Sequence, residues 1–310
     1  MRNNFLDTLF ELAKADPRIT FITGDLGYGV VEKFMEQLPD QFLNAGVAEA
    51  NMTSVAAGMA LSGRIVFTYS IANFPTLRCL EQVRNDVCYH DANVKVVSIG
   101  GGFAYGAMGA THHAVEDLAV MRALPNMTVV APGDPIEARA ATRALVAMPG
   151  PGYLRLGKAG EPKVHSGDVD FAIGRAIRLR DGGDVTLIST GGMLHTTVQA
   201  AELLAGRGIQ ARVLSMHTVK PIDVGAILAA ARETSALATI EEHSLIGGLG
   251  SAVSEVLAEQ VDHVLPFRRL ALPSVFSTDW GSQAYMLKRN GLDPTGIAAS
   301  VQGLLEGRKR

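Results

Sequence analysis

One carboxylate of the chain lies where chemistry is easy to support. Residues 41–43 have the apolar pattern of a strand end, Gly46 suits a tight turn, and Glu49 opens a run of small residues typical of a helix. Open parallel sheets bind ligands just outside the carboxyl ends of their strands, and a helix N-terminus stabilises negative charge. Glu49 is therefore the first candidate, although capping is the commoner role of a glutamate in a first helical turn.

Two adjacent histidines follow a long glycine-rich loop. Residues 95–100 have the apolar pattern of a buried strand, residues 100–109 lack periodicity, and His112 and His113 come shortly after them. Loops at the carboxyl ends of strands commonly carry binding residues. Because adjacent side chains point in different directions, at most one of the two histidines is expected to face a site.

Two other polar stretches follow predicted strands. Residues 24–29 contain three glycines around Asp25, but they lack the G-x-G-x-x-G spacing and the following helix of a dinucleotide site. Glu241, Glu242 and His243 end a predicted strand at 236–240. A polar edge or a contact between domains explains these three residues better than catalysis does.

Strand and helix patterns alternate along the chain and would position these residues. Strands are predicted at 19–23, 64–69, 95–100, 127–131, 152–156, 184–190, 211–216, 236–240 and 267–270, and helices at 1–16, 48–61, 75–89, 134–148, 193–207, 222–232, 247–261 and 294–306. This order predicts an α/β fold of two domains, each an open, mostly parallel sheet flanked by helices. The predicted domains are 1–160 and 173–310, with a polar linker at 161–172.

Composition argues against several classes of function. The net charge is −3 without a basic block, so nucleic acid is not an expected partner. No apolar run approaches the ~18 residues of a membrane span. Cys79 and Cys88 lie on one predicted helix that a disulfide would break, so reduced thiols and a cytoplasmic location are expected. No cysteine and histidine cluster has metal-site spacing, and no metal site is expected in this chain.

The chain resembles transketolases, and more narrowly the small, separately encoded subunit of split transketolases. The resemblance covers essentially the whole chain and rests on an ordered set of motifs, namely Gly24–Leu26, Gly46–Met52, Gly109–His112, Leu124–Asn126 and Glu241–Gly250. It implies a pyrimidine-binding domain at 1–160 and a transketolase C-terminal domain at 173–310. It also implies thiamine diphosphate as the cofactor and the transfer of a two-carbon ketol unit from a ketose to an aldehyde.

The resemblance further implies that this chain works with a partner. The family binds Mg²⁺ and the diphosphate through a Gly-Asp-Gly motif followed at a distance by Asn, and this sequence has no such element. The expected partner is an N-terminal transketolase subunit that carries the diphosphate-binding domain, in an α2β2 assembly. The metal ligands are expected on that partner.

Residue roles also follow from the resemblance. Glu49 would bond the cofactor's aminopyrimidine and His112 a substrate oxygen, as the two catalytic residues. The implied cofactor contacts are Asp25, Leu26, Glu49 and the aromatic candidates for stacking, Phe67, Tyr69 and Phe74. The implied substrate contacts are His112, His113, Arg2, Arg78, Met108, Arg155 and Lys158.

Several of these substrate positions depart from the transketolase pattern. The family uses a serine, a histidine and an aspartate where this sequence has Gly29, Gly100 and Met108. Arg78 matches an arginine of 1-deoxyxylulose-5-phosphate synthases only if three residues are inserted here. Losing polar partners redirects substrate choice, so the hypothesis is a modified, nucleotide-linked or larger sugar rather than an ordinary sugar phosphate.

The sequence is also compatible with two alternatives. One is a 1-deoxyxylulose-5-phosphate-synthase-like or other 2-oxo-acid-dependent carboligase or decarboxylase subunit. The other is a non-catalytic scaffold or regulatory subunit, against which the retention of Glu49 and His112 argues.

Overall fold

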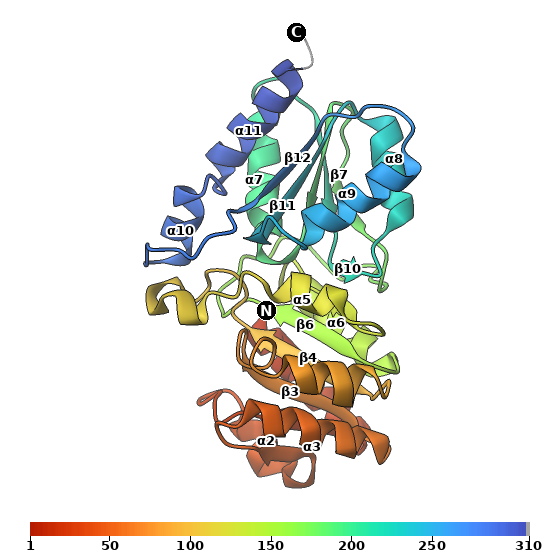
Figure 1. Cartoon of the computed structure of the whole chain (residues 1–310), viewed down its shortest axis with the longest axis vertical. Coiled ribbons are helices and arrows are strands. Elements are labelled where there is room, and N and C mark those ends of the chain that lie inside the picture. Colours follow the sequence, from red (N-terminus) through yellow and green to blue (C-terminus); the bar gives the residue numbers. More distant parts are fainter. Residues whose placement is uncertain (308–310) are drawn as a thin grey trace.

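The computed structural model describes residues 1–307, which form two α/β domains built on separate sheets (Figure 1). The first sheet has seven strands in the order β10-β5-β6-β4-β3-β1-β2. Their bounds are β1 Ile19–Thr23, β2 Phe42–Asn44, β3 Ile65–Ile71, β4 Val94–Ile99, β5 Thr128–Val130, β6 Gly152–Leu156 and β10 Thr218–Lys220. All neighbours pair in parallel except β10 and β5, which are antiparallel.

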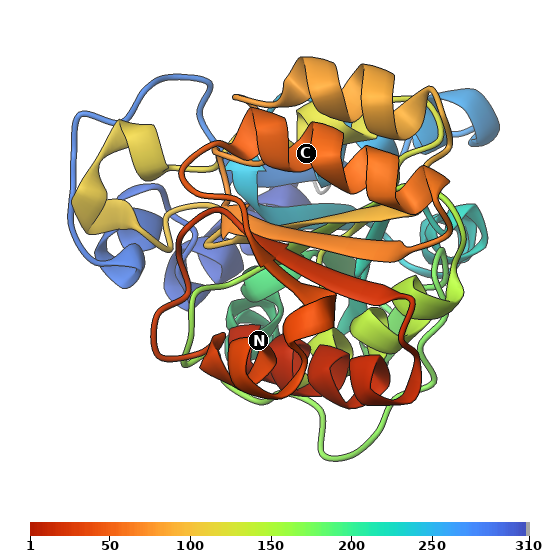
Figure 2. The same ribbon diagram turned by 90° about the horizontal axis from the view of Figure 1, so that it is seen from below.

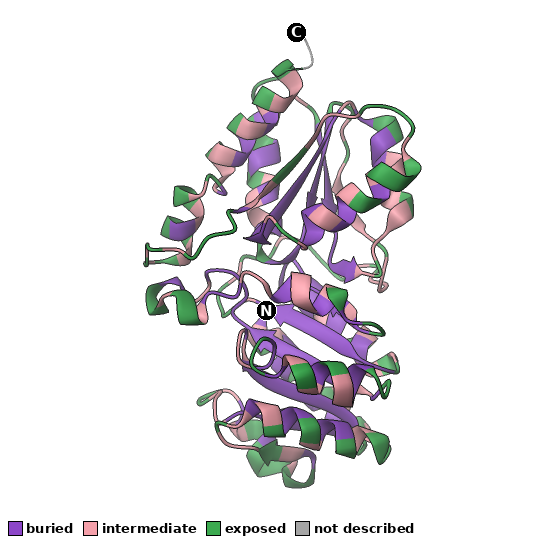
Figure 3. Ribbon diagram, in the orientation of Figure 1, coloured by how far each residue is buried: buried purple, intermediate pink, exposed green. Residues whose placement is uncertain are grey.

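Helices cover both faces of the first sheet. Figure 2 shows α1 (Arg2–Ala15) on one side of this sheet and α3 (Glu49–Leu61) on the other. Apolar side chains of α1 and α6 (Pro135–Ala147) pack on one face, and those of α3 and α5 (Asp117–Ala123) pack on the other. The inner strands β1, β3, β4 and β6 are therefore buried on both faces (Figure 3), as parallel strands usually are, whereas the edge strand β2 is partly exposed.

The second sheet belongs to the C-terminal half. Its order is β12-β11-β8-β9-β7, and only β7 runs antiparallel to its neighbour. The strands are β7 Ile177–Arg180, β8 Val185–Ser189, β9 Ala211–Ser215, β11 Leu237–Ser244 and β12 Phe267–Leu272. The flanking helices are α7 Leu194–Ala205, α8 Val224–Glu233, α9 Leu249–Gln260 and α11 Pro294–Glu306. Of the helices in residues 1–307, none has the length and hydropathy needed to cross a membrane.

The structure confirms the predicted fold class and most of the predicted elements, with one clear error. The helix predicted at 75–89 is instead a set of turns, followed by the short α4 (Leu80–Gln82) and a π-helical segment at Val83–Cys88. Pro75 therefore lies in a turn and not at a helix start. Short elements were also missed, among them α2 (Glu32–Gln37), β7, β10 and α10 (Gln283–Arg289).

An amine is buried in the first sheet. Lys95 of β4 is fully buried, and its Nζ donates hydrogen bonds to the carbonyl oxygens of Met148 (2.8 Å) and Gly150. Burial lowers the pKa of Lys95 to about 7, against a smaller opposing effect of Asp91. Neutral and protonated forms of this lysine are therefore close in free energy near neutral pH.

Candidate active site

The candidate site lies along the carboxyl edge of the first sheet. The loops that follow β1, β2, β3 and β4 all leave their strands at this edge, because the four strands are parallel. These loops carry most of the residues singled out from the sequence. The fold thus brings together segments that are up to about ninety residues apart in the chain.

Glu49 is a buried carboxylate at this edge. It is the first residue of α3 and is 2% exposed. Its oxygens accept hydrogen bonds from Ser70 Oγ at 3.3 Å and Arg78 Nη1 at 3.1 Å. A Cβ atom at Gly24 would lie only 3.3 Å from Glu49 Cγ, so glycine gives the carboxylate its room.

Arg78 covers this carboxylate from the solvent side. Its side chain is 58% exposed and forms an ion pair with Glu49. The guanidinium also lies 5.9 Å from the centre of the Phe74 ring. Only the Arg78 side of this pair is exposed, so its guanidinium can return to water, but the buried Glu49 carboxylate then needs a new partner, which an entering ligand would supply.

The two loops beside Glu49 are fixed to each other through Asn44. Asn44 Oδ1 accepts from the backbone N–H groups of Asp25 and Gly46, both at 3.0 Å, and its Nδ2 donates to Asp25 Oδ1 at 2.9 Å. Asp25 has a positive φ of 56°. Leu26 is half-buried against the core on the α1 side, and its carbonyl accepts from Thr23 Oγ1. Asp25 and Leu26 therefore shape the loop next to the carboxylate.

The structure contradicts two of the three aromatic candidates. Phe67 and Tyr69 are 0% and 1% exposed and lie on the α1 face of β3, where the rings of both pack against Phe5. Side chains two apart in a strand share a face, so both rings are committed to the core and cannot stack on a ligand. Phe74, in the turn after β3, is half-buried and remains the candidate.

His112 lies next to Phe74. The rings of His112 and Phe74 meet edge to face with their centroids 5.4 Å apart. The centroid of the Tyr105 ring lies 6.3 Å from that of His112. His112 Nδ1 is 3.0 Å from Thr111 Oγ1. The contacts of Glu49, Arg78, Phe74 and His112 are therefore continuous.

His113 is not placed to contact a substrate. It is 4% exposed, its Nε2 donates to the carbonyl of Gly106 at 3.1 Å, and its ring packs on Phe103. The structure does not support the prediction of a substrate contact for His113, because its ring is buried and is held by Gly106 and Phe103.

Asn73 is a site residue that sequence reasoning missed. Its Nδ2 donates to the carbonyl oxygens of Thr111 (3.3 Å) and His113 (2.9 Å), on either side of His112. Its Oδ1 is buried and has no hydrogen-bond partner among the described residues. A buried acceptor without a donor is costly, and an orphan beside this site points to a ligand group. Its place directly before Phe74 was the only sequence signal.

The remaining predicted substrate residues divide into two groups. The first group lies around the loop that carries Tyr105 and contains Arg2, Lys158 and Met108. Lys158 Nζ is 4.9 Å from the centre of the Tyr105 ring. Burial raises the pKa of Tyr105, and the charge of Arg2 lowers it. Met108 is 55% exposed. Arg155 is 5% exposed and forms an ion pair with Asp117 at 2.7 Å, so the prediction that it binds substrate is wrong.

The Glu241–His243 motif forms a contact between the domains, as its sequence position suggested. Glu242 accepts from the backbone N–H of Phe103 at 2.7 Å, and His243 Nε2 accepts from that of Ala119 at 3.2 Å. Glu241 accepts instead from two backbone N–H groups at the start of α9. None of the three side chains faces Glu49 or His112.

The arrangement suits a flat, nitrogen-containing ring more than a metal. Residues 1–307 contain no group of three or more histidine, cysteine, aspartate or glutamate side chains that could hold an ion. They offer instead a buried carboxylate, an unpartnered amide oxygen and a half-buried aromatic ring. A carboxylate can bond a ring nitrogen, and an aromatic ring can pack on a heterocycle.

Comparison with known proteins decides the family. Residues 1–161 match the pyrimidine binding domain of transketolase, and residues 174–297 match the transketolase C-terminal domain. The chain belongs to the transketolase family. The pyrimidine-domain match contains Glu49, Phe74 and His112.

Several similar proteins are single subunits of transketolases. The chain is 42% identical to an apulose-4-phosphate transketolase subunit of Phocaeicola vulgatus (strain ATCC 8482), over 97% of this chain and 96% of that protein. It is 40% identical to the 6-deoxy-6-sulfo-D-fructose transketolase subunit SqwH of Clostridium sp. (strain MSTE9), over 99% and 94%. A solved "split gene transketolase, inactive beta4 tetramer" superposes with a TM-score of 0.90 at 39% identity, covering 98% of each chain.

Proposed function

We propose that this chain supplies the pyrimidine-facing half of a thiamine diphosphate site in a split transketolase that moves a two-carbon ketol unit from a ketose to an aldehyde. The observation that carries the proposal is the buried Glu49 carboxylate, joined through Arg78 and Phe74 to His112. The cofactor, when bound, supplies the carbon nucleophile for breaking and forming the carbon–carbon bond.

Each side chain then has a defined task. Glu49 bonds a ring nitrogen of the aminopyrimidine and holds a proton there, in a position shielded from water. The Phe74 ring packs on the pyrimidine, and Asn73 Oδ1 is free to accept from a ligand N–H or O–H. His112 donates to a substrate oxygen as charge develops on it. Arg78 leaves Glu49 when the cofactor enters.

A partner subunit completes the proposed site. This chain lacks a Gly-Asp-Gly element, and its described residues lack a metal cluster. The solved relative made of β subunits alone is described as inactive. The diphosphate and Mg²⁺ ligands are therefore assigned to an N-terminal transketolase subunit, in an α2β2 assembly. The two free, buried cysteines fit a reducing compartment, the cytoplasm.

Binding of thiamine diphosphate tests the shared site. In calorimetry with Mg²⁺, this chain alone is expected to give no saturable heat, and the same chain mixed with an N-terminal transketolase subunit from the same genome is expected to bind. The reason is that each chain holds only one half of the ligand's contacts. Tight Mg²⁺-dependent binding by this chain alone would contradict the partner requirement.

The proposed substrate is a modified sugar with an anionic group. Arg2 and Lys158 place two cations around Tyr105. In contrast, Gly29, Gly100 and Met108 are uncharged residues at positions where the transketolase pattern has polar substrate contacts. The names of two relatives specify a 4-phosphate and a 6-sulfo sugar. We expect the assembled enzyme to prefer such sugars over xylulose 5-phosphate with ribose 5-phosphate. An ordinary KM and full turnover with the latter pair would disprove this preference.

A further inference from the structure

We infer that the C-terminal domain positions His112 through a clamp made by Arg155, Asp117 and Glu242 on residues 100–116, here called the histidine loop. The inference rests on the proposed function only for its effect on turnover. Arg155, Asp117 and Glu242 touch neither Glu49 nor Phe74 in the structure, so they are positioning residues.

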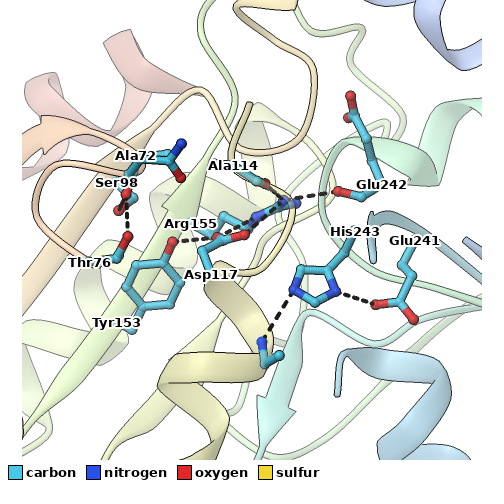
Figure 4. Close-up of polar contacts among 12 residues, drawn as sticks. Ala72, Thr76, Ser98, Ala114, Asp117, Tyr153, Arg155, Glu241, Glu242 and His243 are labelled. Atoms are coloured by element: carbon cyan, nitrogen blue, oxygen red, sulfur yellow. Dashed lines mark hydrogen bonds and ion pairs between the residues drawn. The ribbon is translucent and has the colours of Figure 1, made fainter. Parts of the chain in front are cut away.

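The first arm of the clamp is the Arg155 guanidinium. Its Nε and Nη2 donate to the two carboxylate oxygens of Asp117 at 2.7 and 3.2 Å. The same Nη2 donates to the carbonyl of Ala114 at 2.9 Å and to the carbonyl of Glu242 at 3.0 Å (Figure 4). One buried side chain thus ties β6 to the end of the histidine loop and to the C-terminal domain.

Asp117 stays charged inside this network. Burial raises the pKa of Asp117, but the charge of Arg155 and hydrogen bonds from Arg155 and Tyr153 outweigh that effect and hold it below its usual value. The Tyr153 hydroxyl donates to Asp117 Oδ2 at 2.5 Å. An ion pair whose remaining lone pairs are satisfied in this way is costly to break from one side.

The second arm is the Glu242 carboxylate, at the other end of the histidine loop. Its Oε1 accepts from Phe103 N–H at 2.7 Å, and Gln283 Nε2 donates to both oxygens at 3.1 and 2.8 Å. A Cβ atom at Gly102 would lie 2.3 Å from Glu242 Cδ, and Gly102 has a φ of +66°. Only glycine therefore allows the loop to come this close to the carboxylate.

The two arms hold the loop closed around His112. Gly102 and Ala114 exchange backbone hydrogen bonds of 2.8 and 3.0 Å across the base of the loop. Between them the backbone forms only short 3₁₀ turns, at Gly106–Met108 and Ala110–His112. Ser244 N–H adds a bond of 2.7 Å to the Val115 carbonyl. A displacement of about 1 Å at a catalytic group can lower a rate by about 10²-fold, so the clamp determines how well His112 is placed.

Glu242 gives the clamp a dependence on pH. Burial raises the pKa of Glu242 to about 7, and the negative charge of Asp117 raises it further. The hydrogen bonds from Phe103 N–H and Gln283 and the charge of Arg155 lower this pKa, but they do not outweigh burial. Glu242 also borders a cavity, and the other titratable groups that line it are Arg155, His195 of α7, Glu161 and the amine of Met1, which pairs with Glu161. Protonation removes negative charge from the acceptor of Phe103 N–H, so the clamp is expected to loosen below about pH 7.

The test uses three variants of the full chain assembled with its partner subunit. Glu242→Ala is expected to lower kcat about 10- to 100-fold with little change in KM or in thiamine diphosphate affinity. Glu242→Gln keeps an acceptor for Phe103 and cannot ionise. It should lose less activity than Glu242→Ala, and the fall of kcat below about pH 7 should disappear. Glu255→Gln, which breaks the Arg122–Glu255 ion pair away from the histidine loop, should leave kcat and its pH profile unchanged.

A second measurement does not depend on turnover. Amide hydrogen exchange of residues 100–116, followed by mass spectrometry on this chain, should increase in Glu242→Ala and stay at the wild-type rate in Glu255→Gln. If exchange is faster in Glu242→Ala but the assembled wild-type protein has no transketolase activity, the clamp stands and the proposed function is rejected. Unchanged exchange and unchanged kcat in a folded Glu242→Ala would overturn the clamp. A Glu242→Gln variant that keeps the pH dependence would overturn Glu242 as the group that makes the clamp respond to pH.

Discussion

Glu49→Ala is expected to lower the turnover of the assembled enzyme by about 10²- to 10⁴-fold, the usual contribution of a positioned proton-transfer group. The carboxylate is buried and its side-chain partners are a hydroxyl and a guanidinium, those of Ser70 and Arg78, so neither neighbour can replace it. Steady-state kinetics of the assembled enzyme, with thermal unfolding as a check on the fold, measures the effect. Unchanged turnover would favour the non-catalytic scaffold instead.

Two matched variants separate chemistry from helix capping. Glu49→Gln keeps the shape and can still accept from Ser70 Oγ, but it does not ionise, and it is expected to lose turnover nearly as strongly as alanine. Glu32 is also in the first turn of a helix, where its Oε1 accepts from Gly29 N–H at 2.6 Å. Glu32→Gln should therefore change turnover by less than about 2-fold, since it removes only a capping charge.

The free energy of unfolding is expected to rise by up to about 4 kcal/mol between about pH 7 and pH 10 because of Lys95. Its pKa is lowered to about 7 in the folded chain, against an ordinary value of 10.5. Between these values the unfolded chain binds a proton that the folded chain does not bind, so stability increases with pH. Below about pH 7 both states are protonated, and the full cost of burying the charge remains.

Urea denaturation of this chain and of Lys95→Met over this pH range isolates the contribution. Burial also raises the pKa values of Cys79 and Cys88 to about 11, which lowers stability at the alkaline end in both proteins. The difference between the two proteins removes those shared effects. A difference that stays constant from pH 7 to pH 10 would show that Lys95 titrates normally in the folded chain.

Local pattern was enough to predict the parallel sheets and the edge that carries the site. Residues 19–23 and 152–156 were predicted as strands with the bounds that the structure has, because both are short, mostly apolar segments between clear breaks. Glu49 and the pair His112 and His113 were singled out by their place after such strands, and the resemblance to transketolases chose His112 from the pair. Phe74 was one of three aromatic candidates, and choosing it required knowing which face of β3 points to α1.

Residues whose role depends on distant partners could not be assigned from the sequence. Arg155 was predicted to bind substrate, but its ion-pair partner Asp117 lies 38 residues away, and its other contacts come from two further segments. His113 differs from His112 only in the direction of its side chain, which the loop backbone sets. Asn73 is distinguished by a lone unpartnered atom, which no sequence pattern encodes.

The antiparallel strand β10 limits how this protein can be recombined. It belongs to the C-terminal half but pairs with β5, and Lys220 at its end donates to the carbonyl oxygens of Arg122 (3.0 Å) and Leu124. A chimaera that joins the first domain of this chain to the second domain of a relative within residues 161–172 would therefore pair β5 with a β10 strand from the relative. A first domain produced without β10 would expose the edge of β5, and open edges of this kind promote aggregation. Successful domain exchange between relatives must therefore transfer β5 and β10 as a matched pair.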